Sequence, residues 1–388
     1  MSATSTDRSA VESPYELDIY PKRGIQIVRG KDAKVWDHEG REYLDAAGAY
    51  GVANVGHANE EVARAVGEQA RKLVSCPGAF SSDVRSKLLQ KLVAIAPKSL
   101  TRAFLCNSGT EALEAAIKFA RYTTGREEFV CAMRAFHGRT LGALSATYEP
   151  KYKQEFAPLV PGFTHVPFND CSRLEEAVTE RTAGVILEIV QGEGGIHVGD
   201  GEYFATARRV CRERGAMLIV DEVQTGFCRT GRMFASMHFD LEPDMMCVAK
   251  GIAGGLPMGA TLVSDAVAAP TGLHGSTFGG NPLCCAAASA AIDFMKRHRL
   301  DERARERGDL LVSLIEPKKL SRVREVRHLG LMIGVELREK VTPILRALQQ
   351  RGVLALPAGK TVLRLLPPLV ITEGEIRYLA DQIAEELR

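Results

Sequence analysis

The sequence predicts an α/β fold: a large domain built around a mostly parallel sheet, with a small α+β domain beside it. Helical stretches alternate with short apolar segments from about residue 58, the pattern of strand–helix units in a parallel sheet. The pattern of predicted elements changes after about residue 300, where strand and helix candidates are mixed. The 388 residues suffice for two packed units. We therefore place the large domain at 58–300 and assign 1–57 and 301–388 to the small domain.

The elements follow from local patterns. Lys34–Asp37 and Glu42–Asp45 flank a His-Glu-Gly-Arg turn and indicate a hairpin. The strand candidates of the large domain are Ala103–Leu105, Phe129–Met133, Gly184–Val190, Met217–Val220 and Met245–Val248. The C-terminal region contains strand candidates Glu325–Glu336 and Thr361–Leu366 and helix candidates Thr342–Arg351 and Glu373–Leu387. Since ligands collect at the carboxyl ends of parallel strands, chemistry is expected directly after the strands of the large domain.

Composition excludes several classes of protein. A net charge of +2, with acids and bases mixed, argues against nucleic-acid binding by bulk charge. No apolar run approaches membrane-spanning length, and the polar first fourteen residues, expected to be loosely held, resemble neither a signal nor a transit peptide. Nine cysteines without Cys-x-x-Cys spacing argue against a disulfide framework or zinc ribbon and favour the reducing cytoplasm. The nine histidines form no metal-binding helical pair, so no metal is expected.

The first strand candidate is followed by Asn107-Ser-Gly-Thr-Glu-Ala and then by a predicted helix. One face of that helix is apolar, formed by Leu113, Ala116, Ile117 and Ala120. Ser108 or Thr110 can simply cap the helix. Alternatively, Gly109 allows close approach of the backbone, and the positive end of the helix holds a phosphate. Both interpretations stay open for this stretch alone.

The next two strand ends carry an aromatic residue and charged residues. Phe136, in Phe-His-Gly-Arg-Thr, is either a core residue or a face that stacks on a planar ring. Arg139 is either a solvated charge or a bidentate clamp for a carboxylate. Glu188, inside an apolar strand, needs a partner or a site. Glu193, in Gln-Gly-Glu-Gly-Gly, is compatible with a mobile surface loop.

An aspartate and a lysine end the last two strands. Asp221 can keep a heteroaromatic nitrogen protonated. Lys250 directly precedes three glycines in five positions. It either ends a strand or provides an amine that must lose its proton, as in a Schiff base. A phosphate cradle, a stacking aromatic ring, an aspartate, an amine and a carboxylate clamp together form the set that pyridoxal phosphate requires.

Five motifs in combination resemble the class III (ω-amino-acid) aminotransferases of fold type I, over nearly the whole chain. They are Ser-Gly-Thr-Glu-Ala, Phe-His-Gly-Arg-Thr, Asp-Glu-Val-Gln-Thr-Gly, Ala-Lys-Gly and Gly-Ser-Thr-Phe-Gly-Gly-Asn-Pro. The resemblance implies that Lys250 binds pyridoxal 5'-phosphate covalently and later moves the proton, while Asp221 pairs with the ring nitrogen. The implied cofactor contacts are Ser108, Gly109, Thr110, Phe136, Asp221, Val223, Gln224, Lys250 and Thr277. Thr277 would reach the phosphate of the partner subunit, which implies a homodimer, or a dimer of dimers.

The resemblance also implies how the substrates are held. Arg139 would bind the distant carboxylate of either substrate, and Arg364 the α-carboxylate of glutamate. Glu193 would neutralise Arg364 when the substrate presents an ω-amine, and Ser276 would lie near the substrate. A structural ion pair is the simpler interpretation of Glu193 and Arg364.

The substrate is narrowed by two positions. Phe-His-Gly-Arg-Thr resembles the N2-acetylornithine enzymes, whereas free-ornithine enzymes usually carry Trp where His137 stands. Tyr50 differs from acetylornithine enzymes and resembles both ornithine enzymes and those acting on lysine held through its α-amine by a small acidic carrier protein. We therefore predict transfer of the ω-amino group of N2-blocked ornithine or lysine to 2-oxoglutarate, giving a semialdehyde and glutamate, in arginine or lysine biosynthesis. The chain length and the blocking group (acetyl or carrier) stay open.

Three alternatives accompany this prediction. A free-ornithine δ-aminotransferase would use the same residues. A same-fold aminomutase would not need 2-oxoglutarate, so a Glu193/Arg364 switch would have no purpose. A non-catalytic regulatory protein that binds pyridoxal phosphate would need an added recognition module, for which the termini are expected to leave no room.

Overall fold

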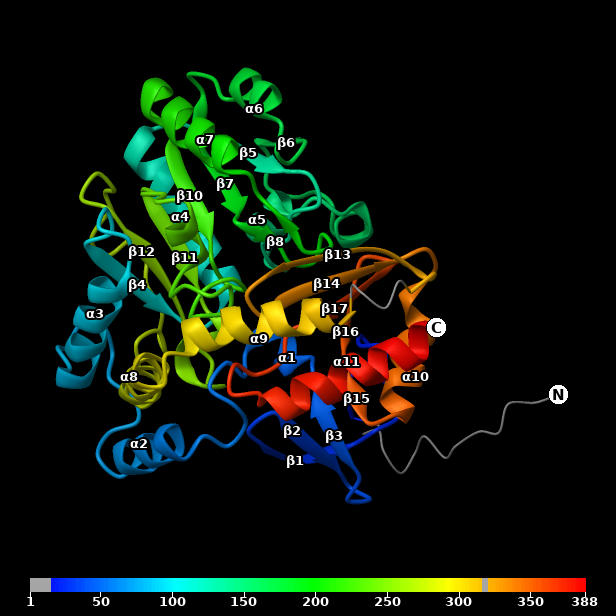
Figure 1. The fold of residues 1–388 in the computed structure, drawn as a ribbon. Helices are drawn as coiled ribbons and strands as arrows, with labels where there is room; N and C mark the ends of the chain where they lie inside the picture. Colours follow the sequence, from blue (N-terminus) through cyan, green and yellow to red (C-terminus); the bar gives the residue numbers. More distant parts are fainter. Residues whose placement is uncertain (1–14, 316–319) are drawn as a thin grey trace.

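The computed structural model describes residues 15–315 and 320–388, so the expectation for the first fourteen residues lies outside the described residues. Its central sheet has the strand order β4-β12-β11-β10-β7-β5-β6. The strands are β4 (Arg102–Cys106), β5 (Glu128–Ala132), β6 (Phe163–Val166), β7 (Thr182–Glu188), β10 (Met217–Asp221), β11 (Met245–Val248) and β12 (Gly259–Val263). Figure 1 shows this sheet in the upper left part of the molecule.

The predicted mostly parallel sheet is confirmed, with one antiparallel strand that was not predicted. Strands β11, β10, β7, β5 and β6 run parallel, whereas β12 pairs antiparallel with both β11 and β4. One prediction is wrong in its extent. The segment Gly184–Val190 is not a single strand, because β7 ends at Glu188 and Val190–Gln191 form β8, which pairs with β9 (His197–Val198).

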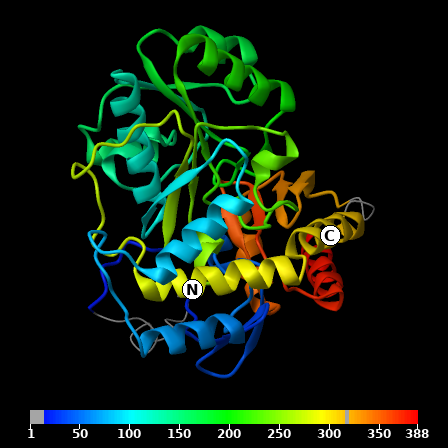
Figure 2. The same ribbon diagram turned by 90° about the vertical axis from the view of Figure 1, so that its left-hand side faces the viewer.

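Helices cover both faces of the central sheet (Figures 1 and 2). On one face, Leu113 and Ile117 of α4 (Gly109–Thr124) share a core with Ile219 of β10. On the other face, Phe204 of α7 (Gly201–Arg214) shares a core with Val220. Because successive strand residues point to opposite faces, β10 must be apolar throughout, which explains its continuous hydrophobic run. The remaining helices here are α2 (Glu60–Ala70), α3 (Asp83–Ile95), α5 (Leu141–Ala146), α6 (Cys171–Ala177) and α8 (Pro282–Arg297).

Two further four-stranded sheets lie below and to the right of the central sheet in Figure 1. One is β1-β2-β3-β15 and the other β13-β14-β17-β16. Their strands are β1 (Ile27–Lys31), β2 (Lys34–Asp37), β3 (Glu42–Asp45), β13 (Val323–Leu329), β14 (Met332–Leu337), β15 (Val353–Leu354), β16 (Leu356–Ala358) and β17 (Val362–Leu365). Helices α9 (Leu300–Ile315), α10 (Val341–Gln350) and α11 (Glu373–Leu387) accompany them, and a short α1 (Gly48–Gly51) follows β3.

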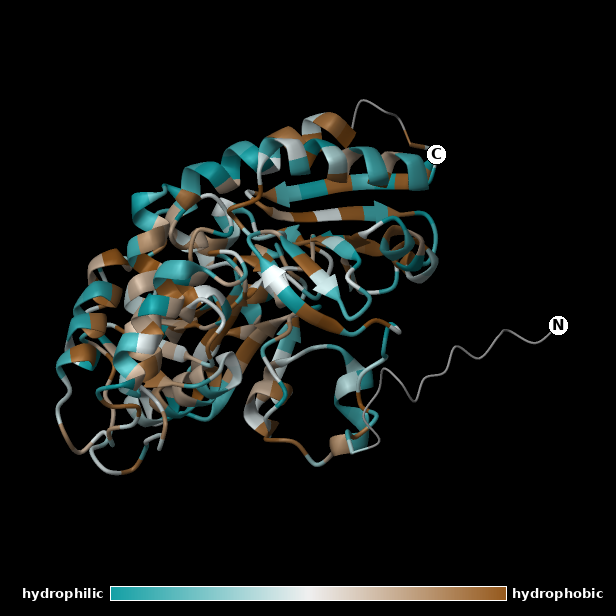
Figure 3. Ribbon diagram, turned by 90° about the horizontal axis from the view of Figure 1, so that it is seen from below, coloured by the Kyte–Doolittle hydropathy of each residue, from teal (hydrophilic) through white to brown (hydrophobic). Residues whose placement is uncertain are grey.

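The predicted hairpin is confirmed as β2 and β3, and the segment Glu325–Glu336 proves to be a hairpin of two strands. Strand β3 pairs in parallel with β15, so distant parts of the chain share one sheet. The division of the chain after residues 57 and 300 stays a prediction. Figure 3 shows hydrophilic and hydrophobic residues alternating along the helices near the surface, as two-faced helices require.

Cys106, Cys131, Cys228 and Cys247 are buried free thiols. None of the helices within the described residues is both long and apolar enough to cross a membrane. Over the same residues, no group of three or more histidine, cysteine, aspartate or glutamate side chains is placed to hold a metal ion.

Candidate active site

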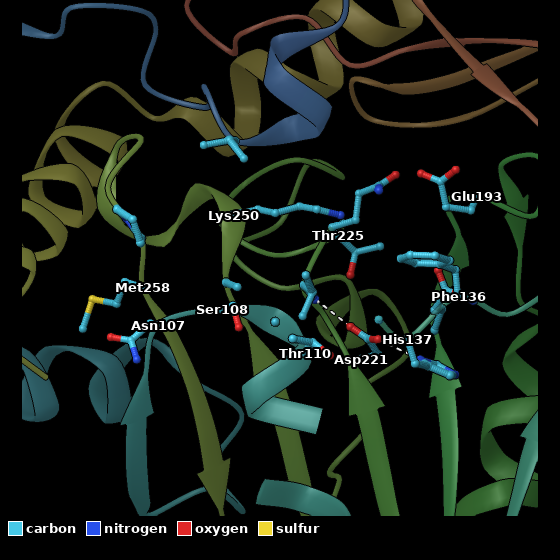
Figure 4. A pocket seen from close by; sticks show the side chains of 18 of the residues that line it. Asn107, Ser108, Thr110, Phe136, His137, Glu193, Asp221, Thr225, Lys250 and Met258 are labelled. Atoms are coloured by element: carbon cyan, nitrogen blue, oxygen red, sulfur yellow. Dashed lines mark hydrogen bonds and ion pairs between the residues drawn. The ribbon is translucent and has the colours of Figure 1, made fainter. Parts of the chain in front are cut away.

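A cavity of about 340 Å³ lies at the carboxyl ends of the central strands, where the alternating pattern places it. Its lining includes Ser108, Gly109, Thr110, Phe136, Glu193, Asp221, Val223, Gln224 and Lys250, all singled out from the sequence. Figure 4 shows Lys250 extending into this cavity above Thr225 and Asp221, toward the side where Phe136 and Glu193 lie. Six loops that are distant in sequence thus meet around one lysine amine.

Lys250 follows β11 and opens the short helix η5 (Lys250–Ala253), with a left-handed φ of 44°. Such a backbone angle is strained for a lysine, and strain of this kind concentrates at functional sites. Gly251 is required by close packing, since a Cβ there would lie 2.4 Å from Nδ2 of Asn54. Burial lowers the pKa of Lys250 below its ordinary value. The amine is therefore easier to deprotonate than that of an exposed lysine.

The N-terminus of α4 lies at the same cavity. Ser108 is the N-cap, and its Oγ accepts a hydrogen bond of 3.3 Å from the backbone N–H of Glu111. The first N–H groups of the helix, at Gly109 and Thr110, have no partner within the helix and can bind an anion. A Cβ at Gly109 would lie 2.7 Å from Cγ1 of Val223, so only glycine fits there. Capping and a phosphate cradle, alternatives in the sequence, are compatible with each other in the structure.

Asp221 is held by two neighbours at the end of β10. Its Oδ1 accepts from the backbone N–H of Val223 at 3.0 Å, and its Oδ2 lies 2.8 Å from Nδ1 of His137. Burial opposes a charge on His137, but the hydrogen bond to Asp221 and that carboxylate's charge outweigh burial and leave the pKa of His137 raised. His137 thereby orients the Asp221 carboxylate. Sequence reasoning used His137 only to compare subgroups and missed this contact.

Glu188 connects two loops of the cavity. Its Oε1 accepts from the backbone N–H of Phe136 at 2.9 Å, and its Oε2 accepts from that of Gly192 at 3.0 Å. Burial raises the pKa of Glu188 to about 7, although His137 opposes the shift. The sequence indicated that Glu188 needed a partner or a site, and the structure supplies both. Glu188 couples the position of the Phe136 loop to that of the turn carrying Glu193.

Arg364 and Glu193 form an ion pair at the edge of the cavity. Nη1 of Arg364 lies 2.6 Å from Oε1 of Glu193 and donates a second bond of 3.3 Å to Oε1 of Gln224. The Arg364 side chain, on β17, is 1% exposed, whereas that of Glu193 is 27% exposed. The buried cation is thus fixed, and the more exposed acid, on a glycine turn, is the partner that can move away.

Besides Arg364, which contacts the lining residues Glu193 and Gln224, four predicted residues lie outside the cavity lining. Two of them contact residues that line it: the guanidinium of Arg139 lies 5.2 Å from the ring centre of Phe136, and Oγ of Ser276 accepts from Nδ2 of Asn107 at 3.0 Å. Tyr50 and Thr277 are exposed. The structure therefore does not bring Thr277 into this cavity.

Tyr50 lies on a strained segment next to the Arg364 strand. Ala49 and Tyr50 have φ values of 49° and 62°. Gly48 is indispensable there, because a Cβ would lie 2.1 Å from the carbonyl oxygen of Leu366. The backbone at Gly48 thus lies against Leu366, which directly follows the strand that carries Arg364.

These groups fit pyridoxal 5'-phosphate. Its aldehyde needs a reachable amine, its ring nitrogen an aspartate and its phosphate a helix N-terminus, which Lys250, Asp221 and the Gly109–Thr110 backbone offer around one cavity. Glycine at position 109 allows the start of α4 to pack closely against Val223, which lines the same cavity. The fold and the site together define a pyridoxal-phosphate-dependent enzyme of fold type I.

Comparison with known proteins narrows this class to one family. Residues 19–387 match the model of the family described as aminotransferase class-III, and the chain belongs to that family. It is 50% identical over 372 residues to a [LysW]-aminoadipate semialdehyde transaminase of Deinococcus radiodurans, covering 95% of this chain and 87% of that protein. It is 43% identical over 385 residues to an acetylornithine aminotransferase of Methanocaldococcus jannaschii, covering 97% and 96%.

A solved ornithine aminotransferase of Toxoplasma gondii, described with pyridoxal phosphate partly occupying its active site, superposes with a TM-score of 0.92. It is 32% identical, with 96% of this chain and 92% of that chain covered. The protein is therefore a pyridoxal-phosphate-dependent transaminase, as the sequence predicted. This conclusion removes the aminomutase and the non-catalytic regulatory protein from the alternatives.

Proposed function

We propose that the protein transfers the ω-amino group of an N2-blocked ornithine or lysine to 2-oxoglutarate, giving the semialdehyde and glutamate. The observation that carries this proposal is the Glu193–Arg364 ion pair at the cavity edge. An ω-amine donor presents an uncharged alkyl chain to this region, which requires a neutralised arginine. Glutamate presents an α-carboxylate there, which requires a free one. One mobile acid beside one buried arginine serves both needs.

The proposed roles of the cofactor-binding residues follow from their positions. Lys250 binds the cofactor and moves the substrate proton, with burial keeping its amine ready to act as a base. Asp221, oriented by His137, holds a proton on the ring nitrogen, so that the bound cofactor supplies an electron sink. Gly109 and Thr110 bind the phosphate through their backbone, aided by the Ser108 cap. Phe136 stacks on the ring, Gln224 faces its hydroxyl, and Val223 packs against the cradle.

The substrate contacts are proposed on the same basis. Arg139 binds the carboxylate distant from the reacting amine, and its guanidinium lies 3.9 Å from the ring centre of Tyr152, which fixes its direction. Ser276 lies near the substrate, held by its hydrogen bond to the lining residue Asn107. Arg364 binds the α-carboxylate of glutamate after Glu193 withdraws.

Assembly and location belong to the proposal as well. Thr277 is exposed and does not line the cavity of its own chain, which suits contact with the phosphate in a partner subunit. Large apolar side chains are exposed near it at Phe278 and Leu273, 62% and 72% respectively, as a dimer interface would leave them in one chain. We propose a homodimer, or a dimer of dimers, in the cytoplasm.

The blocking group is tested by offering three donors with 2-oxoglutarate: N2-acetylornithine, N2-acetyllysine and lysine attached through its α-amine to a small acidic carrier protein. The relative from Deinococcus radiodurans is named for a [LysW]-linked substrate, which supports the carrier. Activity with the carrier is expected to fall as salt rises, because charge attraction between two proteins is screened. Activity with the acetylated donors is expected to depend much less on salt. Turnover of free diamines alone would refute the proposal.

Free ornithine is the second candidate substrate, and Tyr50 is the observation that favours it. Its hydroxyl can accept a hydrogen bond from a free α-ammonium group, and its ring is 57% exposed. The resemblance of the fold to solved ornithine aminotransferases is compatible with this candidate. A free α-ammonium would, however, bring a second positive charge close to Arg139, which is costly unless it is compensated.

A further inference from the structure

A second cleft lies behind the turn that carries Glu193. Its volume is about 640 Å³, and it shares no lining residue with the active-site cavity. The loops after β5 and β6, the β8–β9 hairpin and the edge strand β13 form it. Its polar lining consists of Arg134, Asn169, Gln191, His197, Arg327 and His328. Within the described residues, this lining holds four basic side chains and no carboxylate.

Arg134 is the cation of this cleft that lacks an anion. Arg327 is paired with Glu336 at 2.6 Å, and His328 with Asp309 at 3.0 Å. Arg134 instead donates to Nε2 of His197 at 3.2 Å, and none of the carboxylates in the described part of the chain pairs with it. Its φ of 65° is left-handed, which costs a non-glycine residue roughly 1–2 kcal/mol.

His197 is neutral in this arrangement, because only a neutral ring nitrogen can accept from a guanidinium. Burial first, and then the charges of Arg327 and Arg134, lower the pKa of His197. The imidazole therefore does not compensate the charge of Arg134. The cleft thus contains the positive charge of Arg134 next to Arg327, whose charge is already neutralised by Glu336.

Gln191 supplies an independent observation. Its side chain is 1% exposed, and its Nε2 donates to the carbonyl of Met133 at 2.7 Å. Its Oε1 is buried and accepts from no donor in the described residues. A buried amide oxygen without a donor costs about 1–3 kcal/mol. The cleft thus presents a cation that lacks an anion and an acceptor that lacks a donor.

The two incomplete groups are neighbours. A Cβ built on Gly194 would lie 3.0 Å from Cβ of Arg134 and 3.2 Å from Cβ of Gln191. Both side chains therefore start beside the Gly194 backbone, and both residues line the cleft. Gly194 and Gly195 directly follow Glu193, and Nη2 of Arg327 donates to the Gly195 carbonyl at 2.9 Å. Arg327 lines the cleft, so this hydrogen bond connects the cleft to the turn that carries Glu193.

We propose that this cleft binds a carboxylate that has an N–H donor beside it, with the carboxylate on Arg134 and the N–H on Oε1 of Gln191. Two sources share this chemistry: a free α-amino acid and the C-terminus of a peptide. The occupant braces the Glu193 turn and so alters the reaction with glutamate. This last consequence rests on the proposed role of Glu193, whereas the binding itself does not.

Calorimetry on the cofactor-loaded enzyme, without any amino acceptor, tests the binding. The probes are N-acetyl-alanyl-glycine for a peptide terminus and 2-aminoisobutyrate for a free amino acid. The C-terminal amide of the peptide removes the charge, and the matching depsipeptide removes the N–H. Arg134→Met is the test variant. Arg346→Gln is the matched control, because Arg346 is an exposed arginine on α10 outside the cleft lining.

At least one probe is expected to bind to the wild type and to Arg346→Gln alike, and the stronger one identifies the source. Arg134→Met and the amide should each weaken binding at least about tenfold, the usual loss for a charge-assisted hydrogen bond. The depsipeptide should bind several-fold more weakly than the peptide. Absence of binding up to about 10 mM, or binding unchanged by Arg134→Met, would overturn the proposal.

The link to Glu193 has a separate readout. In single-turnover reactions, the bound probe should change the rate with glutamate in the wild type and leave it unchanged in Arg134→Met. A probe that binds but leaves this rate unchanged would refute the link. Because calorimetry requires no turnover, failure of the proposed donor in the activity assay is distinguishable from failure of this binding site.

Discussion

The charge of Glu193 can be removed without changing its shape, by Glu193→Gln. In the wild type, this carboxylate is 2.6 Å from a guanidinium that is 1% exposed, so the neutral amide leaves that buried cation without its anionic partner. Packing the alkyl chain of an ω-amine donor against an unneutralised arginine is unfavourable, because the chain removes water from the charge and offers no hydrogen bond in return. The same arginine is then free for the α-carboxylate of glutamate. The variant should therefore separate the two half-reactions.

The size of the effect follows from the burial of the pair. Fully exposed ion pairs contribute about 0–1 kcal/mol and breaking buried ones costs about 3–5 kcal/mol. One member of this pair is buried and the other is 27% exposed, so losing the ion pair should cost about 2 kcal/mol. That free energy corresponds to roughly 30-fold in a rate constant. Glu193→Gln should slow the diamine half-reaction by about this factor and should not slow the glutamate half-reaction.

Single-turnover absorbance changes of the cofactor measure each half-reaction separately. Arg364→Ala is the reciprocal variant and should show the opposite pattern, with the glutamate half-reaction slowed by roughly two powers of ten and the diamine half-reaction much less. Glu202→Gln, on the exposed side of α7, controls for loss of an acid as such. Equal losses in both half-reactions of Glu193→Gln would show that the pair is only structural.

Three further predictions concern the cofactor-binding side. Lys250→Ala should lose roughly three or more powers of ten in turnover, and borohydride reduction of the wild type followed by peptide mapping should find the pyridoxyl group on Lys250 and on no other lysine. Asp221→Asn should stay folded by circular dichroism but be nearly inactive; near-normal turnover would exclude it as the partner of the ring nitrogen. Burial raises the pKa of Glu188 to about 7, so between about pH 4.5 and 7 the native state keeps a proton that the unfolded chain has lost. The contribution of Glu188 to the free energy of unfolding should therefore fall by up to about 3 kcal/mol over this range and stay constant above pH 7. Between these pH values, the unfolding midpoint of the cofactor-free protein should fall less in Glu188→Gln than in the wild type. If the two proteins lost stability equally with pH, the raised pKa of Glu188 would be contradicted.

The strand ends and their chemistry could be predicted from the sequence because both are local signals. Apolar runs mark buried strands, and the residue that ends each run marks the edge of the sheet where ligands collect. Lys250, Asp221 and Gly109 were found in this way. The antiparallel direction of β12 has no local signature, since a buried strand is equally apolar in either direction.

The contacts between distant segments could not be predicted. His137 and Asp221 are 84 positions apart, and nothing in either motif indicates that their side chains meet. Arg229 is a second example: it is fully buried, donates to the Pro367 carbonyl at 2.6 Å and to Oδ1 of Asn54 at 2.7 Å, and so ties together segments from three regions of the chain. Such pairings depend on how the elements pack, and periodicity carries no information about that.

The preference for an N2-blocked donor is the central claim, and the ratio of kcat/KM for N2-acetylornithine over ornithine tests it most directly. The exposed side chain of Tyr50 is the group that can reverse this preference, so the ratio is measured in the wild type and in Tyr50→Ile. The account predicts a wild-type ratio well above one, because an acyl group removes the charge that the site cannot compensate. A wild-type ratio below one that rises in Tyr50→Ile would contradict the account and identify free ornithine as the substrate.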